Sequence, residues 1–582
     1  MNTSKNTPSA TGTPKFPDQV TGMYILAESL RRLGLDTVYG LVGIPVTEAA
    51  YAMQDVGVKF IGFRFEQQAG MAAATHGYLT RKPGVLLTVS SLGFLNGLTA
   101  TANATVNCYP MIQISGASDP KMVDMNMGTY EQLDQYNTAK PLVKAAFRCS
   151  SAKDIPSAVA RAYRAAVSGR PGGVYIDMTT PALADIMDRK DAEKLFYDPV
   201  DIYSPVSPNA GAVKRAAEIL ASAKRPAILL GKGAAYAQVD DKIKELIETY
   251  KIPYLPMSMA KGLMPDNGPM SALSCRSTIM EKSDVVMVIG ARLNWMLSFG
   301  RGKWNPAIKF IQLDVEPQEI DVNVPIAAPV VGDISLSLDA ILSGLKSTGM
   351  HADPSWLTSL QTESNAKNAK FAQRLKDVKS PMDHWTALSA IKPIIESNPD
   401  IILVNEGANT LDDTRDAIDM SLPRHRVDCA TWAIMGMGMG SAVGAATATG
   451  KSVVAIEGDS AFGFSGMDFA TICRFKLPVT VVIFNNGGIY NNIGVNPSSD
   501  PAIKSDPAPT TLDLKARYDK IGEAFGATSY YVTTPEELSE ALKKSIASKA
   551  PAIIDVQLAG DAGKESGHIG YLNPTPLISF TV

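Results

Sequence analysis

Residues 452–490 read SVVAIEGDSAFGFSGMDFATICRFKLPVTVVIFNNGGIY, and this stretch decides the fold. An apolar run ends at Gly458-Asp459, small residues open a helical segment, and a second apolar run ends at Asn485-Asn486. Two apolar runs joined by a helix are typical of parallel strands, because parallel strands need a long crossover connection. Ligands bind at the carboxyl ends of such strands. The stretch therefore predicts an α/β domain with a ligand site at Asp459 and Asn486.

The polar groups at these strand ends suit a hard cation and a phosphate. One carboxylate (Asp459), one amide oxygen (Asn486) and the carbonyl of Gly488 are oxygen ligands of the kind that Mg²⁺ prefers. The backbone amides of Ser460 and Ala461 open the helix and can face a phosphate. The alternative is a plain strand–turn–helix–strand unit that ends by chance in Asp and Asn.

Three other segments repeat an Ala-rich helix, a short basic or Pro turn and an apolar strand. They are PSAVARAYRAAVSGRPGGVYIDM at 156–178, AVKRAAEILASAKRPAILLGKG at 212–233 and EELSEALKKSIASKAPAIIDVQL at 536–558. Helices that alternate with such strands predict an α/β fold of three doubly wound parallel-sheet domains. We expect these segments: a disordered tail 1–19, domains 20–195, 205–350 and 385–560, and a terminal segment 561–582 that closes over the substrate.

Composition excludes several classes of protein. The 55 Lys and Arg against 58 Asp and Glu give a net charge of −3 without a basic block, which argues against nucleic acid as a partner. The five cysteines are scattered, without a C-x-x-C, which is typical of a reducing compartment. We find no targeting or membrane-spanning segment, since the uncharged stretch 83–118 is broken by Pro and Gly. A cytoplasmic location is expected.

Two further segments carry candidate ligand groups. Glu66 follows the apolar run KFIGF and precedes a helix of small residues, where it would be unusually well buried for a glutamate. The alternative is a first-turn carboxylate stabilised by the helix dipole. The Gly- and Met-rich stretch TWAIMGMGMG at 431–440 would let the backbone approach a ligand closely, although its methionines could simply fill a core.

The 457–490 stretch resembles the diphosphate-anchoring signature of thiamine diphosphate enzymes. By that resemblance Asp459, Asn486 and the Gly488 carbonyl hold Mg²⁺, and Glu66 activates the aminopyrimidine ring of the cofactor. The resemblance also implies cofactor contacts at Ala408, Asn409, Ala433, Met435, Ser460 and Ala461. Met435 would hold the cofactor in its bent shape, with the Ala433 carbonyl as partner of the amino group.

A closer resemblance, over about residues 20–575, is to the oxalyl-CoA decarboxylase family. It depends on strings such as VYGLVGIPVTEAA, GTYEQLDQYNTAKP, LLGKGAAYAQ and EGDSAFGFSGM. The resemblance implies thiamine diphosphate- and Mg²⁺-dependent decarboxylation of oxalyl-CoA to formyl-CoA and CO₂ in oxalate catabolism, with catalytic roles for Tyr130, Glu131, Tyr490 and Ser566. Each of these four residues could instead be structural: a buried aromatic, a surface carboxylate or a turn residue.

The same resemblance implies two nucleotide sites and an oligomer. An activating ADP would contact Arg170, Lys232, Arg292, Asp314, Asp333 and Ile334. Coenzyme A would contact Ile44, Arg415, Glu565 and Gly567. The alternative for Lys232 and Arg292 is a surface salt bridge, and the alternative for Arg415 is a solvated position on a helix. The chain is expected to form at least a homodimer, and a homotetramer is usual in the family.

Three departures from the family pattern bear on the substrate. Phe65 stands where relatives often have His, Leu92 stands where Pro is expected, and the stretch 491–502 fits no known pattern. A 2-hydroxyacyl-CoA lyase would share the cofactor and coenzyme A sites, but retention of the Tyr130-Glu131 pair and Tyr490 favours the decarboxylase. An acetohydroxyacid synthase is a further alternative, and it is disfavoured because it would leave the coenzyme A signatures unexplained. A catalytically silent, ADP-binding regulatory subunit is disfavoured by the intact Glu66, Asp459 and Asn486.

Overall fold

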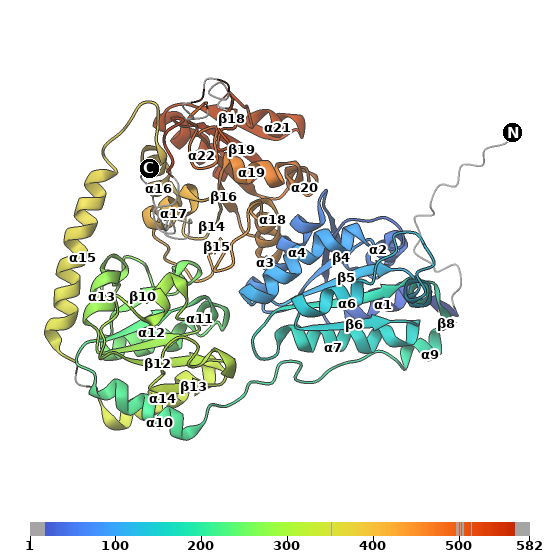
Figure 1. Ribbon diagram of the computed structural model, residues 1–582, viewed down its shortest axis with the longest axis horizontal. Helices are drawn as coiled ribbons and strands as arrows, with labels where there is room; N and C mark the ends of the chain where they lie inside the picture. Colours follow the sequence, from blue (N-terminus) through green and yellow to red (C-terminus); the bar gives the residue numbers. More distant parts are fainter. Residues whose placement is uncertain are drawn as a thin grey trace. The chain divides into compact units, whose positions relative to one another are not determined.

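The computed structural model describes residues 18–350, 352–495, 500, 502, 506–513 and 515–564. The chain divides into two compact units, Met1–Ser204 and Pro205–Val582, and each is described by itself. Figure 1 labels their helices and strands. No helix in the described ranges is both long and apolar enough to cross a membrane.

A six-stranded parallel sheet with the order β3-β2-β4-β5-β7-β6 forms the centre of the first unit. Its strands are β2 (Thr37–Gly40), β3 (Lys59–Gly62), β4 (Gly84–Thr88), β5 (Met111–Ala117), β6 (Ala145–Cys149) and β7 (Gly173–Thr179). A separate antiparallel pair joins β1 (Gln19–Thr21) and β8 (Ile186–Asp188). The helices are α1 (Gly22–Arg32), α2 (Thr47–Asp55), α3 (Glu66–Thr80), α4 (Leu92–Asn107), α5 (Pro120–Asp124), α6 (Gln135–Ala139), α7 (Ile155–Val167), α8 (Thr180–Ala184) and α9 (Arg189–Glu193).

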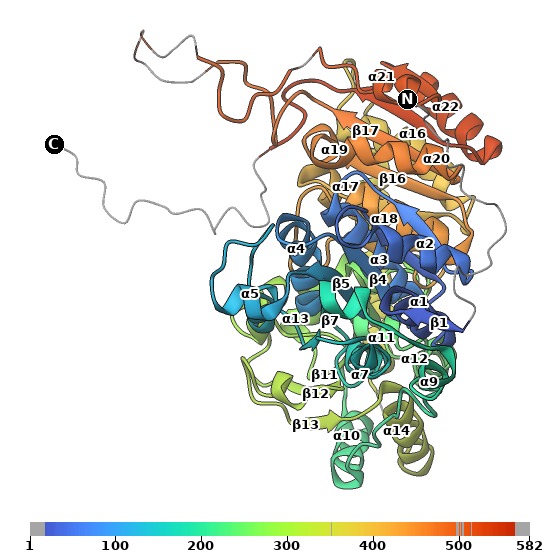
Figure 2. The same cartoon turned by 90° about the vertical axis from the view of Figure 1, so that its right-hand side faces the viewer.

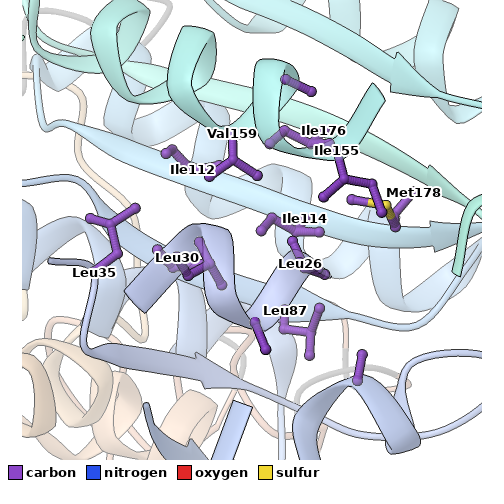
Figure 3. Close-up of a cluster of buried hydrophobic side chains, with 14 of the residues drawn as sticks. Leu26, Leu30, Leu35, Leu87, Ile112, Ile114, Ile155, Val159, Ile176 and Met178 are labelled. Atoms are coloured by element: carbon purple, nitrogen blue, oxygen red, sulfur yellow. The ribbon is translucent and has the colours of Figure 1, made fainter. Parts of the chain in front are cut away.

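Both faces of this sheet are buried. Figure 3 shows Leu26 and Leu30 of α1 and Val159 of α7 packed with strand residues such as Ile114 and Ile176. The neighbouring strand residue Tyr175 belongs to a different cluster with Phe94 and Leu98 of α4. Because side chains alternate between the two faces of a strand, helices must cover this sheet on both sides.

The second unit begins with a five-stranded parallel sheet, in the order β10-β9-β11-β12-β13. Its strands are β9 (Pro226–Leu230), β10 (Tyr254–Pro256), β11 (Val285–Ile289), β12 (Lys309–Asp314) and β13 (Ala328–Val331). Its helices are α10 (Ala210–Ser222), α11 (Lys232–Tyr236), α12 (Asp240–Tyr250), α13 (Arg276–Lys282) and α14 (Ile334–Thr348), and α15 (Pro354–Arg374) leads to the next sheet. Alternate residues of β11 enter two different hydrophobic clusters, so this sheet is also covered on both faces.

A six-stranded parallel sheet with the order β15-β14-β16-β17-β19-β18 completes the second unit. Its strands are β14 (Ile402–Asn405), β15 (Arg426–Asp428), β16 (Val453–Gly458), β17 (Val479–Asn485), β18 (Thr528–Val532) and β19 (Ala552–Gln557). Its helices are α16 (His384–Glu396), α17 (Asn409–Ala417), α18 (Gly438–Thr449), α19 (Asp459–Ser465), α20 (Phe469–Arg474), α21 (Asp519–Ala524) and α22 (Pro535–Ser548). Although far apart in sequence, α16 and α22 lie side by side in Figures 1 and 2.

The topology confirms the predicted fold class of three doubly wound parallel sheets. When the strands of each sheet are renumbered in chain order, both six-stranded sheets read 2-1-3-4-6-5 and the middle sheet reads 2-1-3-4-5. The chain therefore changes direction across each sheet between β2 and β4, between β9 and β11, and between β14 and β16. Such switch points are where doubly wound sheets bind ligands. The exact domain boundaries stay predictions.

Candidate active site

Asp459 lies at the switch point of the last sheet, at the carboxyl end of β16. Its Oδ2 accepts hydrogen bonds from the amides of Gly487 (2.7 Å) and Gly488 (3.2 Å), and its Oδ1 accepts one from the amide of Ser460 at 2.7 Å. The carboxylate is only 2% exposed. Burial raises its pKa from 3.8 to about 6, despite these amides. The structure thus joins two segments that the sequence analysis had paired only by their spacing.

In the turn after β17, Gly487 and Gly488 donate to this carboxylate, and Asn486 and Tyr490 flank them in the chain. Asn486 is 4% exposed, and its Nδ2 donates to the carbonyl of Tyr490 at 2.9 Å. Both Gly487 (φ +69°) and Tyr490 (φ +66°) adopt left-handed backbone conformations in this turn. A carboxylate whose charge is disfavoured by burial, next to an amide side chain and a glycine-rich turn, fits the oxygen donor set of Mg²⁺.

The candidate diphosphate contacts begin two neighbouring helices. Ala408 precedes α17 and Asn409 is its first residue, whereas Ser460 and Ala461 lie in the first turn of α19. The Oδ1 of Asn409 accepts a hydrogen bond from the amide of Lys564 at 3.2 Å. Lys564 therefore contacts Asn409, a residue that is predicted to bind the cofactor.

The loop that carries Ala433 and Met435 is tied down by Glu406, a buried residue that the sequence analysis did not single out. The carboxylate of Glu406 accepts hydrogen bonds from the amides of Gly436 and Gly438, the latter at 2.6 Å. Ala433 is exposed and Met435 is 38% exposed. The methionine is therefore not core filler, and its partly exposed side chain is accessible to a ligand.

A second glutamate, Glu457, lies next to Glu406. Its carboxylate is completely buried, and within the described residues neither oxygen has a hydrogen-bond partner. Burial and the nearby Glu406 hold the pKa of Glu457 well above its ordinary value. Burial likewise raises the pKa of Glu406 to about 7. The pair therefore retains at least one proton at neutral pH, because two adjacent buried carboxylates cannot both ionise cheaply.

In the first unit, Glu66 begins α3 directly after the extended residue Phe65. The side chain is 6% exposed, and its Oε2 accepts a hydrogen bond from Nδ2 of Asn96 on α4 at 3.1 Å. This burial matches the prediction from the sequence, and Asn96 is a partner that the sequence analysis missed.

Tyr130 and Glu131 lie in the loop between α5 and α6. Glu131 has a left-handed backbone (φ +49°), and its Oε2 accepts a hydrogen bond from Oγ of Ser90 at 2.5 Å. Tyr130 is 66% exposed, and its contact with Glu131 raises the pKa of its hydroxyl. It is therefore not a buried aromatic, which was the structural alternative for this residue.

Comparison with known proteins agrees with this geometry. Three family models match the chain: the N-terminal TPP-binding domain of thiamine pyrophosphate enzymes (residues 20–138), their central domain (213–341) and their C-terminal TPP-binding domain (411–556). The oxalyl-CoA decarboxylase of Escherichia coli K12 is 52% identical over 95% of this chain and 97% of its own length. The chain belongs to the thiamine pyrophosphate enzyme family.

Two other relatives carry a different activity in their names. The 2-hydroxyacyl-CoA lyase of Arabidopsis thaliana is 40% identical over 96% of this chain and 99% of its own length. The human 2-hydroxyacyl-CoA lyase 1 is 35% identical over 95% of this chain and 97% of its own length. The resemblance to oxalyl-CoA decarboxylases found in the sequence is thus confirmed, and the lyases are also similar.

In this thiamine pyrophosphate enzyme, most of the predicted ADP contacts follow strands of the middle sheet. Lys232 begins α11 after β9, and Arg292 follows β11, so these two lie at its switch point. Asp314 ends β12, Asp333 caps α14, and Ile334 is the first residue of that helix. Arg292 forms an ion pair with Glu319 at 3.9 Å. Arg170 lies in the first unit, where its Nε contacts Sγ of Cys108 at 2.9 Å.

The predicted coenzyme A contacts are only partly described. Ile44 is 70% exposed and follows β2, at the switch point of the first sheet. Arg415 lies on α17 and forms an ion pair with Asp412 at 2.6 Å. Glu565, Ser566 and Gly567, which the sequence predicts to be site residues, lie outside the described residues, as do parts of the 491–502 stretch.

Two of the residues that the sequence analysis missed, Ser90 and Asn96, are polar side chains whose partners are distant in sequence. Ser90 reaches across 41 positions to Glu131, and Asn96 across 30 positions to Glu66. Glu406 had a usable signal, because, like Glu66, it follows an apolar strand and would be buried there. Glu457 had a related signal, because it is a charged residue inside the apolar strand β16.

Proposed function

We propose that this chain decarboxylates oxalyl-CoA to formyl-CoA and CO₂, in oxalate catabolism, with thiamine diphosphate and Mg²⁺. The observation that carries the proposal is the 52% identity to the Escherichia coli oxalyl-CoA decarboxylase along 95% of the chain, against 40% for the Arabidopsis lyase. The proposal is also supported by Tyr130 and Glu131, whose loop presents an exposed phenol beside a hydrogen-bonded carboxylate.

The cofactor would be held at the switch point of the last sheet. Asp459, Asn486 and the Gly488 carbonyl would bind Mg²⁺. The amides of Ser460 and Ala461, with Ala408 and Asn409, would bind the diphosphate. When bound, the cofactor supplies a nucleophilic carbon and the electron sink that C–C bond cleavage requires. The Ala433 carbonyl and Met435 would hold the aminopyrimidine ring, on a loop that Glu406 fixes.

The other side chains have proposed roles in proton transfer and closure. Glu66 would share a proton with the aminopyrimidine ring, because a buried carboxylate in a dry setting is a strong hydrogen-bond partner. Tyr130 and Glu131 would orient a water molecule at the reacting carbon. Tyr490 would face that carbon, and Ser566 would close over the substrate. Arg415 and Ile44, with Glu565 and Gly567, would bind coenzyme A.

The middle sheet would bind ADP as an activator. Asp314 ends a strand, which suits the ribose diol, while Lys232 and Arg292 suit the phosphates. Asp333 and Ile334 would complete this site at the start of α14.

We infer a homodimer or homotetramer in the cytoplasm. The side chains of Trp432, Phe464 and Ile489, which are 48%, 63% and 40% exposed, support a partner chain at the edge where the candidate site lies. The cysteines are free, which suits a reducing compartment.

The second candidate is a 2-hydroxyacyl-CoA lyase, which forms formyl-CoA and an aldehyde. Two observations favour it: the 40% identity to the Arabidopsis lyase, and Leu92, which begins α4 and is 69% exposed. An exposed apolar side chain there would suit an acyl tail. Against it, Tyr130 and Tyr490 would crowd a long tail.

The test is a competition assay with the pure protein, thiamine diphosphate, Mg²⁺, oxalyl-CoA and 2-hydroxyacyl-CoAs. We expect at least a tenfold preference in kcat/KM for oxalyl-CoA, about 1.4 kcal/mol in transition-state binding. A preference for a 2-hydroxyacyl-CoA would make the lyase correct. An absence of turnover with retained ADP binding would indicate the regulatory subunit.

Variants of Glu66 separate its two interpretations. Glu66→Ala should lower turnover by orders of magnitude and leave cofactor binding largely intact. Glu48, an exposed first-turn acid of α2, is the matched control. If Glu48→Ala caused the same loss as Glu66→Ala, a helix-dipole role would be sufficient to explain Glu66.

A further inference from the structure

The chain segment Ser90–Asn96 contacts two of the proposed catalytic carboxylates from its two ends. At one end, Oγ of Ser90 donates to Oε2 of Glu131 at 2.5 Å. At the other end, Nδ2 of Asn96 donates to Oε2 of Glu66 at 3.1 Å. Glu66 and Glu131 are 65 positions apart in sequence, yet the donors that hold them are six positions apart.

The buried side chain of Gln135 holds the backbone of this segment. The amide of Ser91 donates to Oε1 of Gln135 at 2.5 Å. Gln135 is 1% exposed, and its Nε2 donates to the carbonyl of Gly116 and to the hydroxyl of Tyr175. This network fixes Ser91 in an unusual conformation for a residue with a side chain, with φ +51° and ψ −104°. Such strain persists only where surrounding contacts over-determine the backbone, and it is enriched at functional sites.

Gly93 brings the start of α4 close to the Glu66 carboxylate. A Cβ at Gly93 would lie 3.1 Å from Oε1 of Glu66 and 2.4 Å from Cγ2 of Val89. The carboxylate therefore lies against the first turn of α4, where the helix dipole favours a negative charge. Asn96 is half-buried and lies about one turn after Gly93 on α4. Its side-chain amide adds a directed hydrogen bond to the attraction between the helix dipole and the Glu66 carboxylate.

We propose that Ser90 and Asn96 are positioning residues, which hold the carboxylates of Glu131 and Glu66 on one rigid segment. This inference rests on the proposed function, because Ser90 and Asn96 matter only if the carboxylates of Glu131 and Glu66 take part in the proposed reaction. A carboxylate held by one directed donor keeps a single orientation, whereas a misplacement of about 1 Å can reduce the rate by about 10²-fold.

The first arm of the test concerns Ser90. Ser90→Ala should lower kcat for oxalyl-CoA about tenfold and leave KM within about twofold, since only the orientation of Glu131 changes. Ser90→Thr, which keeps a hydroxyl, should restore most of the rate. In a Glu131→Gln background, Ser90→Ala should cause little further loss, because the carboxylate it serves is already absent.

The second arm concerns Asn96 and measures proton exchange on the bound cofactor, which requires no substrate turnover. Asn96→Ala should slow hydrogen–deuterium exchange at the reactive carbon of bound thiamine diphosphate about tenfold, with cofactor affinity almost unchanged. Asn96→Asp should slow the exchange further, because a like charge would then face Glu66. If Asn96→Ala does not fold, Asn96→Ser serves in its place.

Two control variants keep the inference specific. Ser118 donates to the backbone carbonyl of Tyr130 at 3.1 Å but contacts neither carboxylate, and Thr99 is an exposed residue of α4. Ser118→Ala and Thr99→Ala should behave like the wild type in both arms. Losses in these controls equal to those of Ser90→Ala and Asn96→Ala would overturn the inference, as would wild-type behaviour of both test variants.

The two proposals fail in distinguishable ways. Wild-type protein that turns over no CoA thioester would contradict the proposed function, while the exchange measurement would still test Asn96. Wild-type protein that decarboxylates oxalyl-CoA, with both test variants unaffected, would contradict only the positioning roles.

Discussion

The carboxylate of Glu406 accepts a hydrogen bond from the amide of Gly438 at 2.6 Å, which joins the end of β14 to the first turn of α18. The contact is possible only because residue 438 has no side chain. A Cβ there would lie 2.0 Å from Oε1 of Glu457 and 3.0 Å from Oε2 of Glu406. Both buried carboxylates thus lie against one glycine.

Gly438→Ala should therefore destabilise the protein. Overpacking of a dense interior costs about 1–3 kcal/mol, and here the displaced groups are buried carboxylates. Thermal unfolding should show a lower unfolding temperature. Gly463, exposed on α19 with nothing within 4 Å of its Cβ position, is the matched control. Gly463→Ala should be neutral or stabilising by up to ~1 kcal/mol. Equal effects of the two changes would refute the steric argument.

Glu457→Gln should raise stability at neutral pH. The folded pKa of Glu457 lies well above the ordinary 4.5, so above pH 4.5 the unfolded chain releases a proton that the folded chain retains. The free energy of unfolding therefore falls as pH rises from 4.5 toward the folded pKa, by up to ~1.4 kcal/mol per pH unit. The glutamine variant lacks the contribution of Glu457 to this decline, while that of Glu406 remains. It should therefore be stabilised at pH 7, but little at pH 4.

The measurement is the unfolding temperature of metal- and cofactor-free protein between pH 4 and pH 8. Glu536→Gln, which removes an exposed carboxylate of α22, should leave the pH dependence of the wild type unchanged. A Glu457→Gln curve parallel to that of the wild type would show that Glu457 ionises normally in the folded chain.

Binding of Mg²⁺ with thiamine diphosphate should weaken below about pH 6. Burial raises the pKa of Asp459 to about 6, so protons compete with the cation for this carboxylate. The apparent Kd for Mg²⁺ should rise about tenfold per pH unit below that value. Titration calorimetry at several pH values measures the effect. Asp459→Asn should abolish retention of the cofactor, and Asp513→Asn, at an exposed position, should not. If the affinity for Mg²⁺ did not depend on pH, the assignment of Asp459 as a metal ligand would be contradicted.

ADP should stabilise the protein by mass action. At a hundredfold excess over its Kd, a ligand of the folded state adds about 2.7 kcal/mol to the free energy of unfolding. Lys232→Ala combined with Arg292→Ala should remove this gain without changing thiamine diphosphate binding. Lys303→Ala combined with Lys309→Ala, two exposed cations of the same domain, is the control. Copurification of a yellow flavin would instead identify a different nucleotide in this domain.

Much of the fold and the centre of the candidate site could be predicted because their signals are local. Apolar runs separated by small-residue helices predict parallel strands, and a polar residue directly after such a run marks the binding edge of the sheet. Asp459, Asn486 and Glu66 were found in this way, and the structure buries all three. The family followed from motifs of the same kind, read along nearly the whole chain.

The partners of these groups could not be predicted. Whether Asn96 meets Glu66, or Gly438 meets Glu406, depends on which strands are neighbours in the sheet and on how the helices between them pack. These pairs are 30 and 32 positions apart, and no periodicity of the sequence joins them. Helix and strand formation is governed by short-range propensity and by alternation of apolar residues. Contacts across a sheet edge are decided only when the whole sheet assembles and buries its hydrophobic faces.

The sequence by itself thus determined the class of fold, the family and the strand ends at which we propose that the cofactor binds. Only the tertiary structure decided which donors hold the carboxylates: Ser90 for Glu131, Asn96 for Glu66, and three backbone amides for Asp459. The physical reason is that a buried carboxylate requires donors, and any polar group that the fold brings within hydrogen-bond distance can supply them, wherever it lies in the chain.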